Sequence, residues 1–288
     1  MRVFITGVTG FLGSALFHGF RARGHTVCGT GRAPQSHAHK EALLIPYALG
    51  DRVEPDLLRG YDLLIYAAWD TMNESLRNTH AACSWSTLAA AVHIPAIFIS
   101  SYSAYPDFPT SYGRNKAAAE VAFRMSGQTI VRPALVLGPG GLFADIIRRS
   151  LHSRVLPLPN GGRDSIEYVH VEDCVLGIIK LAEQSIKGEH NFSGGSIPLM
   201  SVVRLVTAAA GSKPPFTIPI PTDLLIAATL PLSILAPIRK LRRNLLGYRE
   251  NSRRRRTSDL LALNGSVTSA HASISSAVHH WRTVVQPH

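Results

Sequence analysis

Residues 3–13 read VFITGVTGFLG, and this stretch decides the fold. The apolar run 3–6 predicts a short buried strand, and residues 12–23 predict a helix directly after it. Three glycines with GxxGxxG spacing lie at the turn between them. The first permits a tight turn, the second lets a pyrophosphate approach the backbone, and the third lets helix and strand pack closely. The stretch therefore predicts a dinucleotide site at a helix N-terminus.

The rest of the first half alternates strands and helices. Strands are expected at 26–29, 63–67, 96–100 and 129–131, and helices at 75–92 and 111–125. This order is typical of a doubly wound α/β fold with a mostly parallel sheet, the Rossmann arrangement.

Proline and glycine become frequent from Gly138, which indicates a smaller α/β substrate lobe at the C-terminal end. We expect residues 1–137 to form the dinucleotide-binding domain that carries the catalytic residues. Residues 138–288 are then mainly the substrate lobe, with about 164–195 returning to the first domain. Asp173 is expected to cap a helix over 174–183.

The composition indicates a packed globular protein. Hydrophobic residues are 45% and charged residues 17% of the 288. Three widely separated cysteines give no disulfide or zinc spacing, which favours a reducing cytoplasm. The glycines interrupt the apolar N-terminus, so no signal peptide is expected. No run reaches the ~20 apolar residues of a membrane span.

The net charge of +11 is concentrated in one segment. Residues 239–256 hold nine Arg or Lys and one Glu. A nucleic-acid-binding fold spreads such residues over its surface, so no nucleic acid is expected. The apolar run 224–238 with this basic segment is open to two interpretations. One is an anionic membrane surface as partner; the favoured one is a lobe helix followed by an exposed basic loop.

The end of the second strand indicates which dinucleotide binds. An acidic residue there would favour NAD by hydrogen bonding to the ribose 2′-hydroxyl. The chain has Gly31 followed by Arg32, and a guanidinium pairs well with a 2′-phosphate. NADP(H) is therefore favoured over NAD(H).

Tyr112 and Lys116 form the pattern YxxxK on the predicted helix 111–125, so both side chains lie on one face. A nearby ammonium and an oxidised nicotinamide stabilise a phenolate, which suits Tyr112 to proton transfer near neutral pH. The strand before this helix ends at Ser100 and Ser101, whose hydroxyls suit binding of a substrate oxygen.

Taken together, these motifs resemble the extended short-chain dehydrogenase/reductase family, in its NAD-dependent epimerase/dehydratase group. The resemblance runs from residue 1 to about 200, and it includes Gly50-Asp51, Ala67-Ala68, Asn78, Arg132-Pro133 and the run 168–173. It implies that Ser101, with Ser103 as a rival, orients the reacting oxygen. Tyr112 is then the acid/base and Lys116 binds the nicotinamide ribose. The implied cofactor contacts are Gly7, Thr9, Gly10, Phe11, Leu12, Gly13, Arg32, Asp51, Arg52, Ala67, Ala68, Tyr112, Lys116 and Pro133.

Two departures from the sugar-nucleotide members bear on the substrate. Ser101 and Tyr112 are only eleven residues apart, so the intervening loop is short. Leu135 stands where those epimerases have an Asn that contacts the diphosphate. The motif from Arg132 to Pro139 resembles dihydroflavonol reductases and 3β-hydroxysteroid dehydrogenases instead. Arg148, Arg149 and Arg163 are the arginines available to an anionic substrate.

The function expected is hydride transfer between a nicotinamide and a carbonyl or secondary alcohol of a small molecule. The alternatives are a nucleotide-sugar epimerase or dehydratase and, from a different class, a dinucleotide sensor without catalysis. The resemblance implies a homodimer. No metal site is expected, because His37, His39, His279 and His280 have no nearby Cys or carboxylate ligands at useful spacing.

Overall fold

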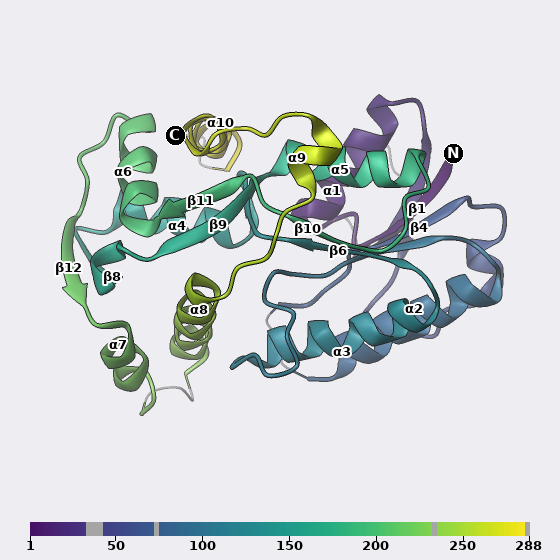
Figure 1. Ribbon diagram of the computed structural model, residues 1–288, viewed down its shortest axis with the longest axis horizontal. Coiled ribbons are helices and arrows are strands. Elements are labelled where there is room, and N and C mark those ends of the chain that lie inside the picture. The colour runs from purple at the N-terminus through teal and green to yellow at the C-terminus, as the bar shows by residue number, and fades with distance from the viewer. Residues whose placement is uncertain (33–42, 72–74, 232–234, 286–288) are drawn as a thin grey trace. The chain divides into compact units, whose positions relative to one another are not determined.

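The computed structural model describes residues 1–32, 43–71, 75–231 and 235–285. They form two compact units, each of which is built from separate stretches of the chain (Figure 1). The first is Met1–Arg132 with Cys174–Asn191, and the second is Pro133–Asp173 with Phe192–His288.

The first unit is organised around a seven-stranded sheet in the described part of the chain. Its order is β10-β6-β5-β4-β1-β2-β3, and the pairings that join β3 through to β6 are parallel. The strands are β1 (Arg2–Thr6), β2 (Thr26–Gly31), β3 (Leu43–Pro46), β4 (Leu63–Tyr66), β5 (Ala96–Ile99), β6 (Thr129–Pro133) and β10 (Glu189–Phe192).

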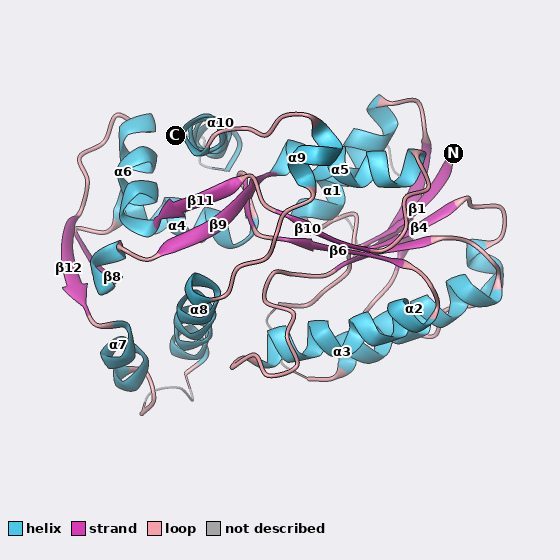
Figure 2. Cartoon of the chain, viewed as in Figure 1, coloured by secondary structure: helices cyan, strands magenta, loops and turns pink. Residues whose placement is uncertain are grey.

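Helices cover both faces of this sheet, as Figure 2 shows. One face carries α1 (Phe11–Ala22) and α5 (Val171–Glu183), and the other carries α2 (Arg77–Ala91) and α3 (Ser111–Met125). The first pair is in close contact, because a Cβ on Gly19 would lie 2.5 Å from Cγ1 of Val175. The predicted doubly wound α/β fold is confirmed.

Large side chains between the sheet and the α2–α3 face form the core of this unit. Tyr66 and Phe98 come from the sheet, Trp85 from α2 and Phe123 from α3. All four side chains are fully buried. The Phe98 and Phe123 rings stack with centroids 4.7 Å apart. Burying each such side chain contributes about 1.5–3 kcal/mol, which fixes α3 against the strands.

The strand order places a ligand crevice at one position. β1 pairs with β2 on one side and β4 on the other, so the chain reverses its direction of winding there. In open α/β sheets, ligands bind outside the carboxyl ends of the strands at this switch point. Gly7 follows β1 and Ala67 follows β4, so both lie at this edge.

The second unit has two small sheets, here counted over its described residues, with order β11-β9-β7 and β12-β8. Its core contains Phe143, Ile147, Val202, Val206, Ile274 and Trp281. The strands are β7 (Leu135–Leu137), β8 (Val155–Pro159), β9 (Ser165–His170), β11 (Gly195–Pro198) and β12 (Phe216–Ile220). The helices are α4 (Gly141–His152), α6 (Leu199–Ala209), α7 (Thr222–Ala228), α8 (Ala236–Arg253), α9 (Leu260–Asn264) and α10 (Ala270–His280).

The expectation of a basic loop after residue 238 is wrong. Residues 239–253 belong to α8, and carboxylates of the same unit pair with two of its cations. Lys240 pairs with Asp145 at 2.6 Å and Arg249 with Asp223 at 2.6 Å. These pairs favour an intramolecular role for the basic segment. No described helix is long and apolar enough to cross a membrane.

Asp173 is not a helix cap, contrary to expectation. α5 begins at Val171, so Asp173 lies inside its first turn. Its carboxylate accepts a hydrogen bond from the backbone N–H of Thr268 at 2.6 Å. Asp173 therefore ties a distant segment to the start of α5 instead of closing the helix end.

Candidate functional site

The glycine turn after β1 has the geometry that its sequence predicts. Gly7 has φ +75°, and its N–H donates to the carbonyl of Thr30 at 2.7 Å. α1 then begins at Phe11 with Gly10 as its N-cap, without a side-chain cap and without an acidic residue in the first turn. A Cβ on Gly13 would lie 2.1 Å from the carbonyl oxygen of Gly7, so only glycine allows this approach.

The adjacent end of β4 is held against the turn. The backbone N–H groups of Ala67 and Ala68 both donate to Oγ1 of Thr6 at 3.1 Å. A Cβ on Gly7 would lie 2.8 Å from Cα of Ala68. The ends of β1 and β4 therefore form one rigid edge.

This edge fits the dinucleotide that the motif implies. The first N–H groups of a helix have no acceptor within it, and here neither a side-chain cap nor a carboxylate competes for them. Such a helix start attracts an anion. Thr9, Phe11 and Leu12, all partly exposed, would hold the pyrophosphate together with the glycines.

The structure also locates the residues expected near the adenosine. Gly31 ends β2, and Arg32 follows it as an exposed side chain. A Cβ on Gly31 would meet Cγ2 of Thr9 at 2.6 Å, so the glycine turn itself occupies the space of a side chain there. Asp51 is exposed and accepts a hydrogen bond from the N–H of Ala48 at 2.7 Å. Arg52 is exposed and pairs with Glu54 at 3.1 Å, and Pro133 is buried as the last residue of β6.

α3 carries the candidate acid/base pair. The helix begins at Ser111, where Oγ1 of Thr110 accepts a hydrogen bond from the N–H of Gly113. Tyr112 is therefore the second residue of the helix, and Lys116 follows one turn later on the same face. Tyr112 is partly exposed, whereas Lys116 is only 4% exposed.

The ammonium of Lys116 is buried among aromatic rings and backbone. Its Nζ donates to the carbonyl of Ile99 at 2.7 Å and lies 3.9 Å from the ring centroid of Trp69. Burial lowers the pKa of Lys116 to about 7, although attraction by the Glu120 carboxylate acts to raise it. Lys116 thus changes its charge near neutral pH.

Three serines follow β5, and the structure distinguishes them. Oγ of Ser100 is buried and donates to Glu120 at 2.5 Å. Ser101 is partly exposed, and its Oγ accepts from the N–H of Ser103 at 3.1 Å, while Ser103 itself is buried. A reacting oxygen needs an accessible hydroxyl, which favours Ser101 over Ser103.

A buried ion-pair network lies one turn beyond Lys116 on α3. The Glu120 carboxylate, 3% exposed, accepts from Nε of Arg132 at 2.7 Å and from its Nη2 at 2.5 Å. Arg132 also contacts Glu189 at 2.6 Å. A hydrogen bond from Arg124 and contacts with Arg132 lower the pKa of Glu189 to about 2. The network joins α3, β6 and β10.

Two residues of this site, Trp69 and Glu120, were not predicted from the sequence. Trp69 directly follows the predicted cofactor contacts Ala67 and Ala68, but the pattern of a tryptophan after a buried strand is typical of an ordinary core residue. Glu120 lies four residues after Lys116, the spacing of neighbours on a helix. That spacing was a usable signal.

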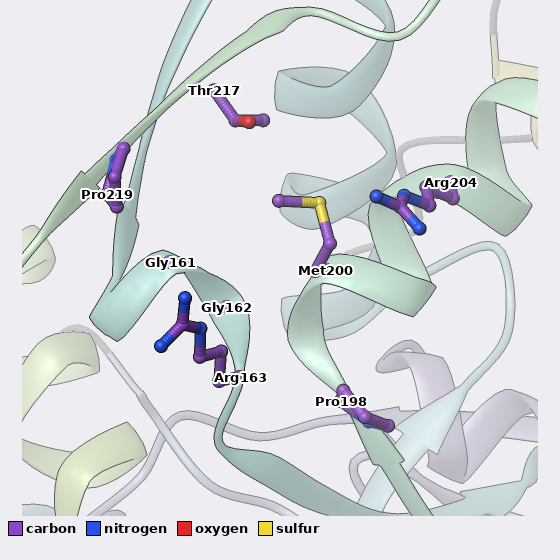
Figure 3. A pocket seen from close by; sticks show the side chains of 8 residues that line it. All are labelled: Gly161, Gly162, Arg163, Pro198, Met200, Arg204, Thr217 and Pro219. Atoms are coloured by element: carbon purple, nitrogen blue, oxygen red, sulfur yellow. The ribbon is translucent and has the colours of Figure 1, made fainter.

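A separate pocket of about 510 Å³ lies in the second unit (Figure 3). The exposed side chains of Arg163 and Arg204 line it, with Met200 between them. Arg148 is paired with Asp145 at 2.9 Å. Of the arginines considered for an anionic substrate, Arg163 lines this pocket.

No group of three His, Cys, Asp or Glu side chains among the described residues is arranged to hold a metal ion. His37 and His39 lie outside the described residues.

Replacing Lys116 by methionine is expected to remove a pH dependence of stability. The unfolded chain keeps the lysine proton up to about pH 10.5, and the folded protein releases it near pH 7. The unfolded state therefore binds more protons between these values, and stability rises with pH. Between pH 7 and pH 9, the free energy of unfolding of the wild type should rise by about 2 kcal/mol relative to that of Lys116→Met. Denaturant unfolding at both pH values measures this. The exposed Lys187 provides the control, because Lys187→Met should leave the slope unchanged. An equal slope in wild type and Lys116→Met would contradict the prediction.

Comparison with known proteins gives a consistent result. The model of the NAD dependent epimerase/dehydratase family matches residues 3–193. The chain is 26% identical over 259 residues to a UDP-glucose 4-epimerase of Mycolicibacterium smegmatis, covering 74% of this chain and 82% of that protein. It is 24% identical over 255 residues to a 2-alkyl-3-oxoalkanoate reductase of Stenotrophomonas maltophilia, covering 74% and 76%.

Solved structures share the fold over nearly the whole chain. MoeE5 in complex with UDP-glucose and NAD superposes with a TM-score of 0.74 at 19% identity, covering 99% of this chain and 100% of that one. The Thermus thermophilus UDP-glucose 4-epimerase in complex with NAD gives 0.70 at 20% identity, with the same coverage.

Proposed function

Because the chain belongs to the NAD dependent epimerase/dehydratase family, we propose that it is an NADP(H)-dependent oxidoreductase acting on a carbonyl or secondary alcohol of a small molecule. The observation that carries this proposal is the position of Tyr112 and Lys116. They lie one turn apart on α3, with the ammonium anchored to the last residue of β5. The second unit is proposed to bind the substrate.

Each residue has a distinct part in this reaction. A bound nicotinamide would supply or accept the hydride. In the reductive direction, Tyr112 donates its phenolic proton to the carbonyl oxygen, which becomes a hydroxyl. Oγ of Ser101 donates a hydrogen bond to the same oxygen and fixes its position. The charged Lys116 favours the phenolate that remains on Tyr112 and thereby lowers the cost of the proton transfer.

The reaction type is tested with NADPH deuterated at C4 and a panel of small ketones, keto acids and their alcohols. Deuterium should appear on the carbinol carbon of a product, with matching loss of NADPH absorbance. If NADPH binds and none of the carbonyl compounds is reduced, nor any of the alcohols oxidised with NADP⁺, the reductase proposal fails.

A nucleotide-sugar epimerase is the second candidate, because the Mycolicibacterium smegmatis relative is named as one. An epimerase returns the hydride to the same substrate, so turnover gives no net absorbance change. Tightly bound cofactor in the purified protein, together with interconversion of UDP-sugar epimers, would favour it. The short loop between Ser101 and Tyr112 and the apolar Leu135 argue for the first candidate.

Replacing Arg32 by alanine is expected to weaken NADPH binding about 10- to 100-fold and to leave NADH binding unchanged. A charge-assisted hydrogen bond to the 2′-phosphate is worth about 1.5–3 kcal/mol, and NADH lacks that phosphate. Fluorescence titration of both nucleotides measures the effect. Arg59→Ala is a matched control, because Arg59 is an exposed arginine of the same unit paired with Asp56. Tighter binding of NADH than of NADPH by the wild type would refute the NADP preference.

A further inference from the structure

Trp69 touches both members of the candidate acid/base pair. Nζ of Lys116 lies 3.9 Å from the centroid of its ring. The Tyr112 ring meets the same indole edge-on, with centroids 6.3 Å apart. One side chain from the end of β4 therefore links the phenol and the ammonium of α3.

The backbone on either side of Trp69 is held in place. Before it, the N–H groups of Ala67 and Ala68 donate to Thr6. After it, Asp70 makes two hydrogen bonds with the buried amide of Asn78. Its N–H donates to Oδ1 at 2.8 Å and its carbonyl accepts from Nδ2 at 2.9 Å. The indole is thus carried by a fixed segment, which explains why Asn78 is buried at the start of α2.

The surroundings of the ammonium make this contact important. One N–H of Lys116 is satisfied by the carbonyl of Ile99, and Phe98 lies beside it with its ring centroid 4.8 Å from Nζ. Glu120, one turn further along α3, is the charged group that acts on it. A cation held against an aromatic face is stabilised most strongly where water is excluded. Lys116 is only 4% exposed, so its contact with the Trp69 face is made where water is largely excluded.

We propose that Trp69 is a positioning residue, whose indole face holds the Lys116 ammonium in its charged form beside Tyr112. The use of that charge in catalysis rests on the proposed function, whereas the contact and its effect on Lys116 do not. The residue connects the glycine turn, through Thr6 and the Ala67-Ala68 pair, to the helix that carries the reacting groups.

The test is a pH titration of Lys116 by NMR in the full-length protein. The chain has only six lysines, so selectively labelled lysine gives few signals, and Lys116→Met assigns the one of interest. Trp69→Leu should lower the pKa of Lys116 by about one unit, because it removes the aromatic face from a desolvated cation. Trp69→Phe keeps an aromatic face, so it should lower the pKa of Lys116 by less than half as much as Trp69→Leu does. An unchanged Lys116 titration in Trp69→Leu would overturn the proposal.

A second measurement uses no Trp69 variant, so it does not depend on whether such a variant folds. Indole emission of the wild type should change as Lys116 titrates near pH 7, and this change should be absent in Lys116→Met. If both proteins give the same emission curve between pH 5 and pH 9, the indole does not contact the ammonium and the proposal fails.

Activity separates this proposal from the proposed function. At pH 7, Trp69→Leu should lower kcat about fivefold, in proportion to the lost ammonium, and the deficit should shrink below pH 6. Trp69→Phe should restore most of the activity. A shifted Lys116 titration with unchanged turnover would support the contact and refute the catalytic use of Lys116. A pH-independent loss of turnover without that shift would refute the positioning role.

Discussion

Replacing Tyr112 by phenylalanine is expected to lower kcat about 10²- to 10⁴-fold while NADPH binding stays within about threefold of the wild type. The change removes one oxygen atom and keeps the ring that meets Trp69 edge-on. The glycine turn and Lys116 are untouched, so the expected loss is in proton transfer to the substrate oxygen. Steady-state kinetics and nucleotide titration of the same preparation measure both quantities.

Tyr61→Phe is the matched control for this prediction. It makes the same chemical change in the same unit, at a ring that packs against Phe4 and Arg2. Activity of Tyr112→Phe close to that of Tyr61→Phe would show that Tyr112 is not the acid/base. If cellular function also survived in Tyr112→Phe, a non-catalytic dinucleotide sensor would be the better explanation.

Replacing Arg132 by methionine is expected to lower the free energy of unfolding by about 3–5 kcal/mol. Arg132 makes two hydrogen bonds to the buried carboxylate of Glu120. Without the guanidinium, that carboxylate keeps Ser100 and a longer contact of 3.5 Å with Arg124. A buried charge left without its main partner costs far more than the exchange of a surface ion pair. Denaturant unfolding measures the loss.

Arg148→Met provides the comparison, because the Arg148 side chain is 60% exposed in its pair with Asp145. This substitution should lower the free energy of unfolding by no more than about 1 kcal/mol. The double variant Glu120→Gln with Arg132→Met should recover part of the loss, since it removes the unpaired charge as well. A loss in Arg132→Met no larger than that of Arg148→Met would mean that the network contributes little to stability.

The elements that local sequence determines were predicted closely. The helix expected over 111–125 is α3 without change, because Thr110 caps its start and Gly127, with φ +64°, follows its end. The turn after β1 was predictable because Gly7 has a positive φ and Gly13 approaches the backbone of Gly7, both of which are local requirements for glycine.

The rest depends on partners that are distant in the chain. Asp173 has the local pattern of a cap, but its carboxylate is occupied by Thr268, ninety-five residues away. The basic segment was expected as a loop because its many cations make the helical pattern hard to recognise in the sequence. The carboxylates that pair with these cations, Asp145 and Asp223, lie elsewhere in the sequence. The burial of Lys116 against Trp69 likewise arises only when β4 and α3 come together.

The homodimer stays a prediction.

The first unit is built from two separate stretches of the chain, and this has a consequence for how such proteins diversify. Its helix α5 and strand β10 are encoded after a long stretch of the second unit, and they supply Val175 beside Gly19 and Glu189 beside Arg132. A gene fragment that stops at Arg132 would lack both contacts. Recombination that exchanges the second unit must therefore cut the gene on both sides of residues 174–191 and retain them. Accumulated point substitution and loop-length change are, for that reason, the simpler routes to a new substrate.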